Sequence, residues 1–190
     1  MNFTSKKYIL ASNSPRRKEL LTNLGLPFES RVKEIDETYP TDLERADVAE
    51  YLAAHKASAY QQDLQPDEVI ITADTIVCLD EKVLNKPIDH AQATRMLTLL
   101  SGRSHEVYTG VCLLSQEKSV VFHDVTTVHF RELTRDEIDF YINNYKPFDK
   151  AGSYGAQDWL GLVGIERIEG SYFNVMGLPV HRLYEELLVF

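Results

Sequence analysis

A long, mainly apolar segment, residues 69–79 (VIITADTIVCL), constrains the fold of this chain more than any other part of the sequence. Its length and its β-branched residues predict a buried strand. Asp74 stands in the middle of it, and an ionised carboxylate among apolar neighbours is costly unless it pairs with a cation, binds a metal or faces a cleft. Asp74 is therefore a candidate functional residue. A structural aspartate, held by a backbone N–H or an arginine, is the alternative.

Strand and helix patterns alternate on both sides of this segment, which predicts an α/β fold. Before it we expect a strand at 8–11, a helix that Ser14 caps and Pro15 begins, and a second helix at 43–61. The features expected after it are a helix capped by Asp89, a β-hairpin of 106–114 and 119–131, a helix begun by the capping box at 134–137, a glycine-rich segment at 152–164, a last strand, and a C-terminal helix opened by Pro179.

The bulk composition fits one folded domain, or one domain with two lobes around a cleft. The chain has 190 residues, of which 44% are hydrophobic, and its formal net charge is −9. That charge argues against a broad basic face for nucleic acid polymers, whereas a small phosphorylated ligand needs only a few local cations. No apolar run approaches the roughly 20 residues that span a bilayer, and no signal peptide is expected, so the sequence predicts a cytoplasmic protein that does not bind the membrane.

Several familiar kinds of site are missing from the sequence. Cys78 and Cys112 match no metal-binding spacing and are expected to be reduced, buried thiols. The histidines form no zinc-binding pattern, and His105 is expected to be a hydrogen-bonded structural residue. There is no Walker A loop and no G-x-G-x-x-G, which weighs against a P-loop NTPase and a Rossmann dehydrogenase.

Residues 12–17 (SNSPRR) form the first candidate site. A strand, a polar turn and a helix N-terminus present free backbone N–H groups and the positive end of the helix dipole. Arg16 and Arg17 on the first turn oppose that dipole unless an anion binds between them. A plain N-cap followed by solvated arginines explains the same residues equally well.

Isolated charges form a second group of candidates. Lys56, in an alanine-rich helical segment, and Lys86, in the loop after the Asp74 strand, could each neutralise a phosphate as a point charge. Considered alone, each is typical of a solvated surface lysine. Glu37 follows Asp36 in a loop and, by itself, reads as a surface acid.

The segment 149–157 (DKAGSYGAQ) combines two glycines with a tyrosine and a glutamine. Glycines allow a backbone to approach a ligand closely, and loops of this kind carry binding residues. Gln157 could offer both a donor and an acceptor to the edge of a base. A plain connecting loop is the alternative interpretation.

Taken together, these segments resemble the Maf family of nucleotide pyrophosphatases, also called septum-formation proteins. They stand in the family's order and spacing and cover almost the whole chain. The matching segments are LASNSPRRKELL (10–21), the Lys56-Ala pair, ADTIV (73–77), Lys86-Pro87, LSGRSHEVYTG (100–110), DKAGSYGAQ (149–157) and GLPV (177–180).

The resemblance implies a single domain over residues 1–190. In it, helices flank an elongated mixed sheet, and two lobes surround a deep nucleotide-binding cleft. The implied reaction cleaves a nucleoside triphosphate between its α and β phosphates, giving the monophosphate and pyrophosphate with the help of Mg²⁺ or Mn²⁺. A homodimer is implied as well.

The resemblance also implies roles for particular residues. Asp74 is similar to the catalytic residue of the family, either as the base or as a ligand of the metal that activates the water. Glu37 falls where the family has an acidic catalytic or metal-linked residue. The residues that match phosphate contacts are Ser12, Arg17, Lys56 and Lys86.

Three positions are similar to the family branch that acts on dTTP and UTP, namely Arg16, Thr75 and Gln157. The branch that acts on 7-methyl-GTP has an aromatic residue, Gln and Glu there. A neutral Gln amide can pair with a uracil or thymine edge, whereas a carboxylate suits the cationic 7-methylguanine ring.

Three alternatives remain open at this point. One is the same chemistry on another nucleotide, such as 7-methyl-GTP or a modified pyrimidine nucleotide. Another is a nucleotide-binding regulator of cell division or septum formation without significant turnover. A nucleotidyltransferase is the third, although the sequence shows no acceptor site for it.

Overall fold

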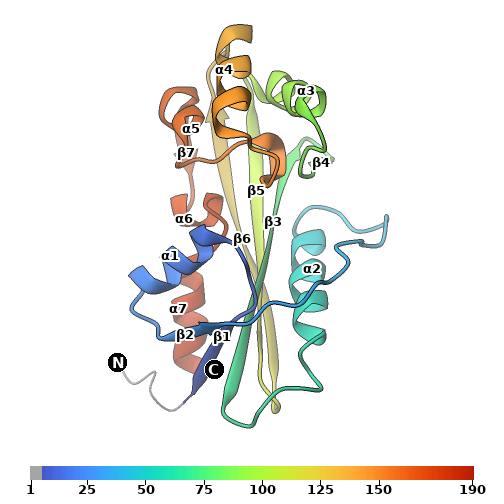
Figure 1. Ribbon diagram of the computed structural model, residues 1–190, viewed down its shortest axis with the longest axis vertical. Helices are drawn as coiled ribbons and strands as arrows, with labels where there is room; N and C mark the ends of the chain where they lie inside the picture. Colours follow the sequence, from blue (N-terminus) through green and yellow to red (C-terminus); the bar gives the residue numbers. More distant parts are fainter. Residues whose placement is uncertain (1–5) are drawn as a thin grey trace. The chain divides into compact units, whose positions relative to one another are not determined.

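The computed structural model describes residues 6–190 (Figure 1). The first five residues, on which the expectation about a signal peptide partly rests, lie outside the described part. The chain divides into two compact units. The first unit extends to Asp74 and adds Thr109–Asp124 and Gly177–Phe190, and the second consists of Thr75–Tyr108 and Val125–Met176. These units correspond to the two expected lobes, while the cleft and the single domain over 1–190 stay predictions.

One mixed sheet contains the seven strands of the described residues, in the order β2-β1-β3-β5-β6-β7 with β4 paired to β3. The strands are β1 (Lys7–Leu10), β2 (Phe28–Ser30), β3 (Glu68–Leu79), β4 (Lys82–Leu84), β5 (Ser104–Leu114), β6 (Ser119–Phe130) and β7 (Ile165–Glu169). Strand β1 is parallel to β2 and β3, whereas β4 and β7 are antiparallel to β3 and β6. The expected α/β fold, a mixed sheet flanked by helices, is confirmed.

Helices α1 (Pro15–Asn23), α2 (Ala46–Ser58) and α7 (Val180–Val189) belong to the first unit. In Figure 1, α2 lies to the right of the strands, and α1 and α7 lie to the left. Ala53 and Ala57 of α2 pack on Ile9 and Ile70 of the sheet, because small side chains allow the helix to approach the strands closely. This packing fixes which α2 residues face β3.

The boundaries of α2 differ from the expected 43–61. The helix begins only at Ala46, because Arg45 has a positive φ of 47° and lies outside the helical region. It ends at Ser58, where Ala59 caps it and the chain continues through turns. Periodicity alone did not reveal either boundary.

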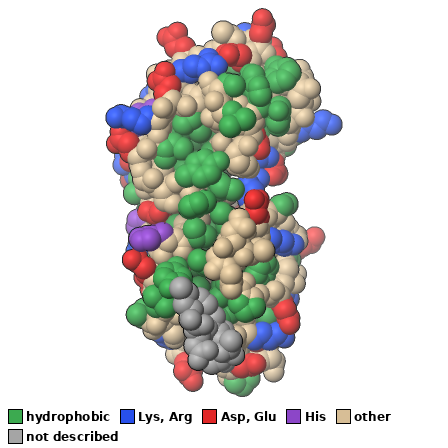
Figure 2. Space-filling model, turned by 90° about the vertical axis from the view of Figure 1, so that its left-hand side faces the viewer, with side chains coloured by type: hydrophobic (Ala, Val, Ile, Leu, Met, Phe, Trp, Pro, Cys, Tyr) green, Lys and Arg blue, Asp and Glu red, His purple; other side chains and the backbone are tan. Residues whose placement is uncertain are grey.

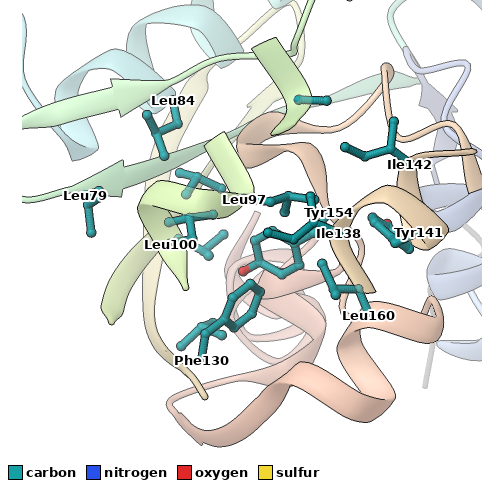
Figure 3. Close-up of a cluster of buried hydrophobic side chains, with 14 residues drawn as sticks. Leu79, Leu84, Leu97, Leu100, Phe130, Ile138, Tyr141, Ile142, Tyr154 and Leu160 are labelled. Carbon is teal, nitrogen blue, oxygen red and sulfur yellow. The ribbon is translucent and has the colours of Figure 1, made fainter. Parts of the chain in front are cut away.

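The second unit holds α3 (His90–Leu100), α4 (Arg135–Tyr145), η2 (Ala151–Ser153), α5 (Trp159–Gly164) and α6 (Tyr172–Val175). Figure 3 shows its core, in which Leu97 of α3, Tyr141 of α4, Leu160 of α5 and Tyr154 converge. The expected capping box of α4 is confirmed, since the Thr134 hydroxyl accepts from Glu137 N and the Glu137 carboxylate accepts from Thr134 N.

The glycine-rich segment 152–164 is not a plain loop, because it contains part of η2 and the whole of α5. Its glycines serve close packing. A Cβ on Gly161 would lie 1.9 Å from the carbonyl oxygen of Ala156, so only glycine lets α5 fold back onto the residues before it. Helical periodicity is weak in six residues, which explains why the sequence did not reveal α5.

Two further expectations are confirmed. Residues 115–118 connect β5 to β6, and Ser115 N donates to Lys118 O at 2.9 Å across that turn, as expected of a hairpin. Cys78 and Cys112 are buried free thiols.

Hydrophobic side chains also reach the surface of the second unit. Leu162 of α5 is 78% exposed, and Tyr172 and Phe173 of α6 are exposed as well. The face drawn in Figure 2 has hydrophobic side chains spread over its upper part. Among the described helices, none is long and apolar enough to cross a membrane.

Candidate active site

Asp74 lies on β3 and forms an ion pair with Lys56 of α2. The Lys56 Nζ donates to Asp74 Oδ1 at 2.5 Å, and the two side chains are only 14% and 11% exposed. The register of α2 on β3 explains why the Lys56 and Asp74 side chains meet. The Thr72 hydroxyl, on the same face of β3 as Asp74, donates to Ala53 O of α2 at 2.7 Å, and Lys56 follows Ala53 by almost one helical turn. The costly carboxylate in the apolar strand is thus paired with a cation.

Glu37 shares the same ammonium group. Its Oε1 lies 2.7 Å from Lys56 Nζ, and its side chain is 44% exposed. Glu37 is the more exposed of the two carboxylates that share this lysine. The structure therefore brings together the three residues Asp74, Glu37 and Lys56, although the sequence around Glu37 gave the weakest signal of the three.

The turn before α1 is organised by two serines. Ser14 caps the helix, and its side chain accepts from Arg17 N at 3.5 Å. Ser12 is 7% exposed, and its Oγ accepts from Ser14 N at 3.1 Å and from Arg17 Nη1 at 3.4 Å. The predicted N-terminal cap is confirmed, and it holds Ser12 and Arg17 together at the positive end of the helix.

Arg17 is fixed from the other side by the C-terminal part of the chain. Its Nε donates to Gly177 O at 2.8 Å. Burial lowers the pKa of the guanidinium from its usual value, and the charges of Asp74 and Glu37 oppose that shift. Those charges show that Arg17 belongs to the electrostatic surroundings of the Asp74 group, and it stays a cation at any physiological pH.

Gly177 contacts the candidate-site residue Arg17, and the sequence assigned it no role. Its φ of 107° lies in a region that side chains rarely adopt, and this conformation places its carbonyl on Arg17. The segment GLPV was recognisable from the sequence, and a Gly-x-Pro just before a helix signals a special turn. The contact with a residue 160 positions away was not predictable.

The other predicted site residues have different surroundings. Arg16 is half-buried on α1 in the first unit. Thr75 follows Asp74 on β3, Lys86 is exposed in the loop after β4, and Gln157 lies in the turn before α5, all three in the second unit. The amide oxygen of Gln157 is buried and has no hydrogen-bond partner among the described residues.

His105 is the structural residue that we expected. It is 2% exposed, and its Nε2 lies 2.7 Å from the Tyr154 hydroxyl. Burial lowers the pKa of its imidazole to about 3, so the ring is neutral at physiological pH.

The candidate site offers two carboxylates to a divalent cation. The described residues contain no cluster of three or more His, Cys, Asp or Glu side chains that could hold a metal ion by themselves. Mg²⁺ is commonly held by only one or two carboxylates together with substrate phosphate oxygens. Asp74 and Glu37, which converge on Lys56, supply those two carboxylates. The residues therefore fit a cation that arrives with a phosphorylated substrate.

Comparison with known proteins places the chain in a family. The family described as "Maf-like protein" matches residues 7–190. The chain belongs to the Maf family. Members of similar sequence are named dTTP/UTP pyrophosphatase. One from Phocaeicola vulgatus is 54% identical over 98% of this chain and 97% of its own, and one from Bacteroides fragilis is 51% identical over the same shares.

A third Maf relative with this name, from Flavobacterium psychrophilum, is 49% identical over 98% of this chain and 95% of its own. Among solved structures, the Ham1 protein of Staphylococcus aureus aligns with 66% of this chain and 72% of that chain, at 15% identity and a TM-score of 0.46. That distant likeness adds nothing to the assignment of the site.

Proposed function

We propose that this chain hydrolyses dTTP and UTP to the nucleoside monophosphate and pyrophosphate. One observation carries the proposal: a buried aspartate and a lysine of the Maf segments are in direct contact, 2.5 Å apart. They lie in a chain that is about half identical, over nearly its whole length, to proteins named dTTP/UTP pyrophosphatase.

The chemistry needs a water, a proton acceptor and cations. The water attacks the α-phosphorus, a new P–O bond forms, and the bond from that phosphorus to the bridging oxygen breaks. The electron pair of the broken bond leaves with the pyrophosphate. The Asp74 carboxylate accepts the proton of the water or, in the alternative role, would hold a divalent cation.

Positive groups stabilise the charge that develops on the phosphates. We assign this task to Arg17, Lys56 and Lys86, with the Ser12 hydroxyl as a further contact. Lys56 pairs with both Asp74 and Glu37, so a bound phosphate would compete with these carboxylates for the ammonium group. Asp74 and Glu37 would hold Mg²⁺ or Mn²⁺, which supplies Lewis acidity when bound.

Recognition of the base is assigned to Arg16, Thr75 and Gln157. The edge of uracil or thymine presents one N–H donor between two carbonyl oxygens. The buried Gln157 amide oxygen has no partner among the described residues, and we assign it as the acceptor for that N–H. The Gln157 amide N–H can donate to an adjacent carbonyl.

A nucleotide panel tests this function. Pyrophosphate release is measured with UTP, dTTP, CTP, GTP and 7-methyl-GTP, each with Mg²⁺, with Mn²⁺ and after chelation by EDTA. We expect turnover of UTP and dTTP at a kcat/KM of about 10⁴ M⁻¹s⁻¹ or more, and its loss with EDTA. A preference for 7-methyl-GTP would refute the assigned specificity. Tight UTP binding without pyrophosphate release would instead indicate a regulator.

The remaining proposals concern the protein as a whole. We propose a homodimer located in the cytoplasm that binds neither nucleic acid polymers nor membranes, on the strength of the family resemblance and the net charge of −9. Light scattering at several concentrations tests the dimer, and a mass that stays monomeric would refute it.

A further inference from the structure

The residue that we assign to base reading, Gln157, sits in a tight turn of the second unit. Asp158 N donates to Gly155 O at 3.1 Å and closes this turn of residues 155–158. The buried Gln157 amide oxygen has no partner among the described residues, and an unpaired buried acceptor is destabilising. The orientation of the turn therefore decides where this acceptor meets a ligand.

A single phenol from α4 joins the residues on both sides of Gln157. The Tyr141 hydroxyl accepts from Gly155 N at 3.1 Å and donates to Asp158 Oδ2 at 2.9 Å. Tyr141 is fully buried, as its place in the core shows (Figure 3). Burial raises the pKa of this phenol, and the charge of Asp158 adds to the shift, so the proton it donates stays in place.

The turn leaves no room for a side chain at Gly155. A Cβ on Gly155 would lie 2.6 Å from Asp158 Oδ2 and 3.1 Å from Gln157 Nε2. The amide group of Gln157 therefore packs against the glycine, and its nitrogen faces the turn. Lys150 adds to the order, since its Nζ lies 3.7 Å from the same oxygen of Asp158.

We propose that Tyr141 is a positioning residue for base selection, because its hydroxyl fixes the turn that presents the Gln157 amide to uracil or thymine. The inference rests on the proposed function and deepens it. The Tyr141 hydroxyl bonds to Asp158 and Gly155, on either side of Gln157, so it affects which base is accepted more than how fast the anhydride is cleaved.

The test removes one oxygen with Tyr141→Phe. We measure kcat and KM for UTP and for CTP, and form the ratio of the two kcat/KM values. The ratio should fall about tenfold, the worth of one well-placed hydrogen bond, mainly through a higher KM for UTP at a nearly unchanged kcat. If this variant does not fold, Asp158→Ala removes the hydrogen bond between Tyr141 and Asp158 from the acceptor side. The same ratio of kcat/KM values is then measured for that variant.

Tyr60→Phe is the matched control. Tyr60 is also a buried phenol, and its hydroxyl likewise accepts from one backbone group, Lys33 N, and donates to one oxygen, Arg31 O, both at 2.9 Å. It belongs to the first unit and not to the turn. Its removal should lower the melting temperature to a similar degree and leave the UTP/CTP ratio at the wild-type value.

A double-mutant cycle shows whether Tyr141 acts through Gln157. We expect Gln157→Ala to lose the preference by itself, and in that background Tyr141→Phe should cause no further change in the ratio. If Gln157→Ala abolishes the preference and Tyr141→Phe keeps it, this inference fails and the proposed function stands. If the wild-type chain shows no preference for UTP and dTTP, both fail together.

Discussion

Lys56 forms ion pairs with two carboxylates, which differ in burial and therefore in the role that each can take. Its ammonium lies 2.5 Å from Asp74 and 2.7 Å from Glu37. Asp74 is the more buried of the two carboxylates and lies on a rigid strand, whereas Glu37 lies in an exposed loop. A buried carboxylate on a strand is the better fixed group for chemistry, since catalytic geometry tolerates little movement.

At the residue scale, we predict that Asp74→Asn lowers kcat for UTP by about 10³-fold or more, because the variant keeps the shape and loses the proton acceptor. Pyrophosphate release is the measurement, and circular dichroism checks the fold. Asp80→Asn is the matched control, since Asp80 also pairs with a cation, Arg103 at 2.7 Å, but is 73% exposed. Rescue of Asp74→Asn by millimolar Mg²⁺ or Mn²⁺ would identify Asp74 as a metal ligand. If the Asp74→Asn variant turned over UTP at the wild-type rate without added metal, both roles would be contradicted.

The turn before α7 is the element that fixes Arg17, the arginine to which we assign a phosphate contact. Gly177 adopts its positive φ, and its carbonyl then accepts from Arg17, whose helix begins at the other end of the sequence. The turn and the cap of α1 thus hold one guanidinium from two sides. Such support reduces the freedom that the side chain loses when it binds a phosphate.

At the element scale, we predict that Gly177→Ala raises the KM for UTP about tenfold while kcat changes less, because the strained alanine moves the carbonyl from Arg17. Steady-state kinetics measure both constants. Gly25→Ala is the control: Gly25 also has a positive φ, of 75°, and a Cβ there meets nothing within 4 Å. Both variants should lose about 1 kcal/mol of stability or more, and only the first should alter KM. Equal kinetics for the two would remove Gly177 from the site.

At the scale of the molecule, burial of His105 keeps its imidazole neutral in the folded chain at pH values well above 3. His105 packs edge-on against Phe130 and Tyr154, with ring centroids 5.0 and 5.4 Å apart. Its pKa is about 3 in the folded chain and is near 6.5 when unfolded. Below pH 6.5 the unfolded chain therefore binds a proton that the folded chain does not, and stability falls as pH falls.

At the scale of the molecule, we predict that the free energy of unfolding drops by about 2 kcal/mol between pH 6.5 and pH 5 through His105 alone. Urea denaturation at a series of pH values measures it. His105→Asn should flatten this slope, whereas His181→Asn, at a histidine that is 76% exposed, should not. The prediction is wrong if the wild-type and His105→Asn slopes coincide.

The sequence by itself determined the class of fold, most of the elements and the candidate residues. Local signals sufficed there, because a cap such as Ser14, the box at Thr134 and the buried strand of Asp74 act through neighbours in the chain. Each motif alone allowed either a functional or a plain structural interpretation. The family resemblance indicated the functional one and the reaction.

Only the tertiary structure decided which residues meet. The pairing of Asp74 with Lys56 and Glu37, and the bridge from Tyr141 to the Gln157 turn, each join elements far apart in sequence. Helix–strand register, side-chain reach and burial fix such contacts, and periodicity does not encode them. The sequence marked Asp74 as a carboxylate in an apolar strand and Lys56 as a candidate cation, but their pairing became apparent only from the packing of α2 on β3.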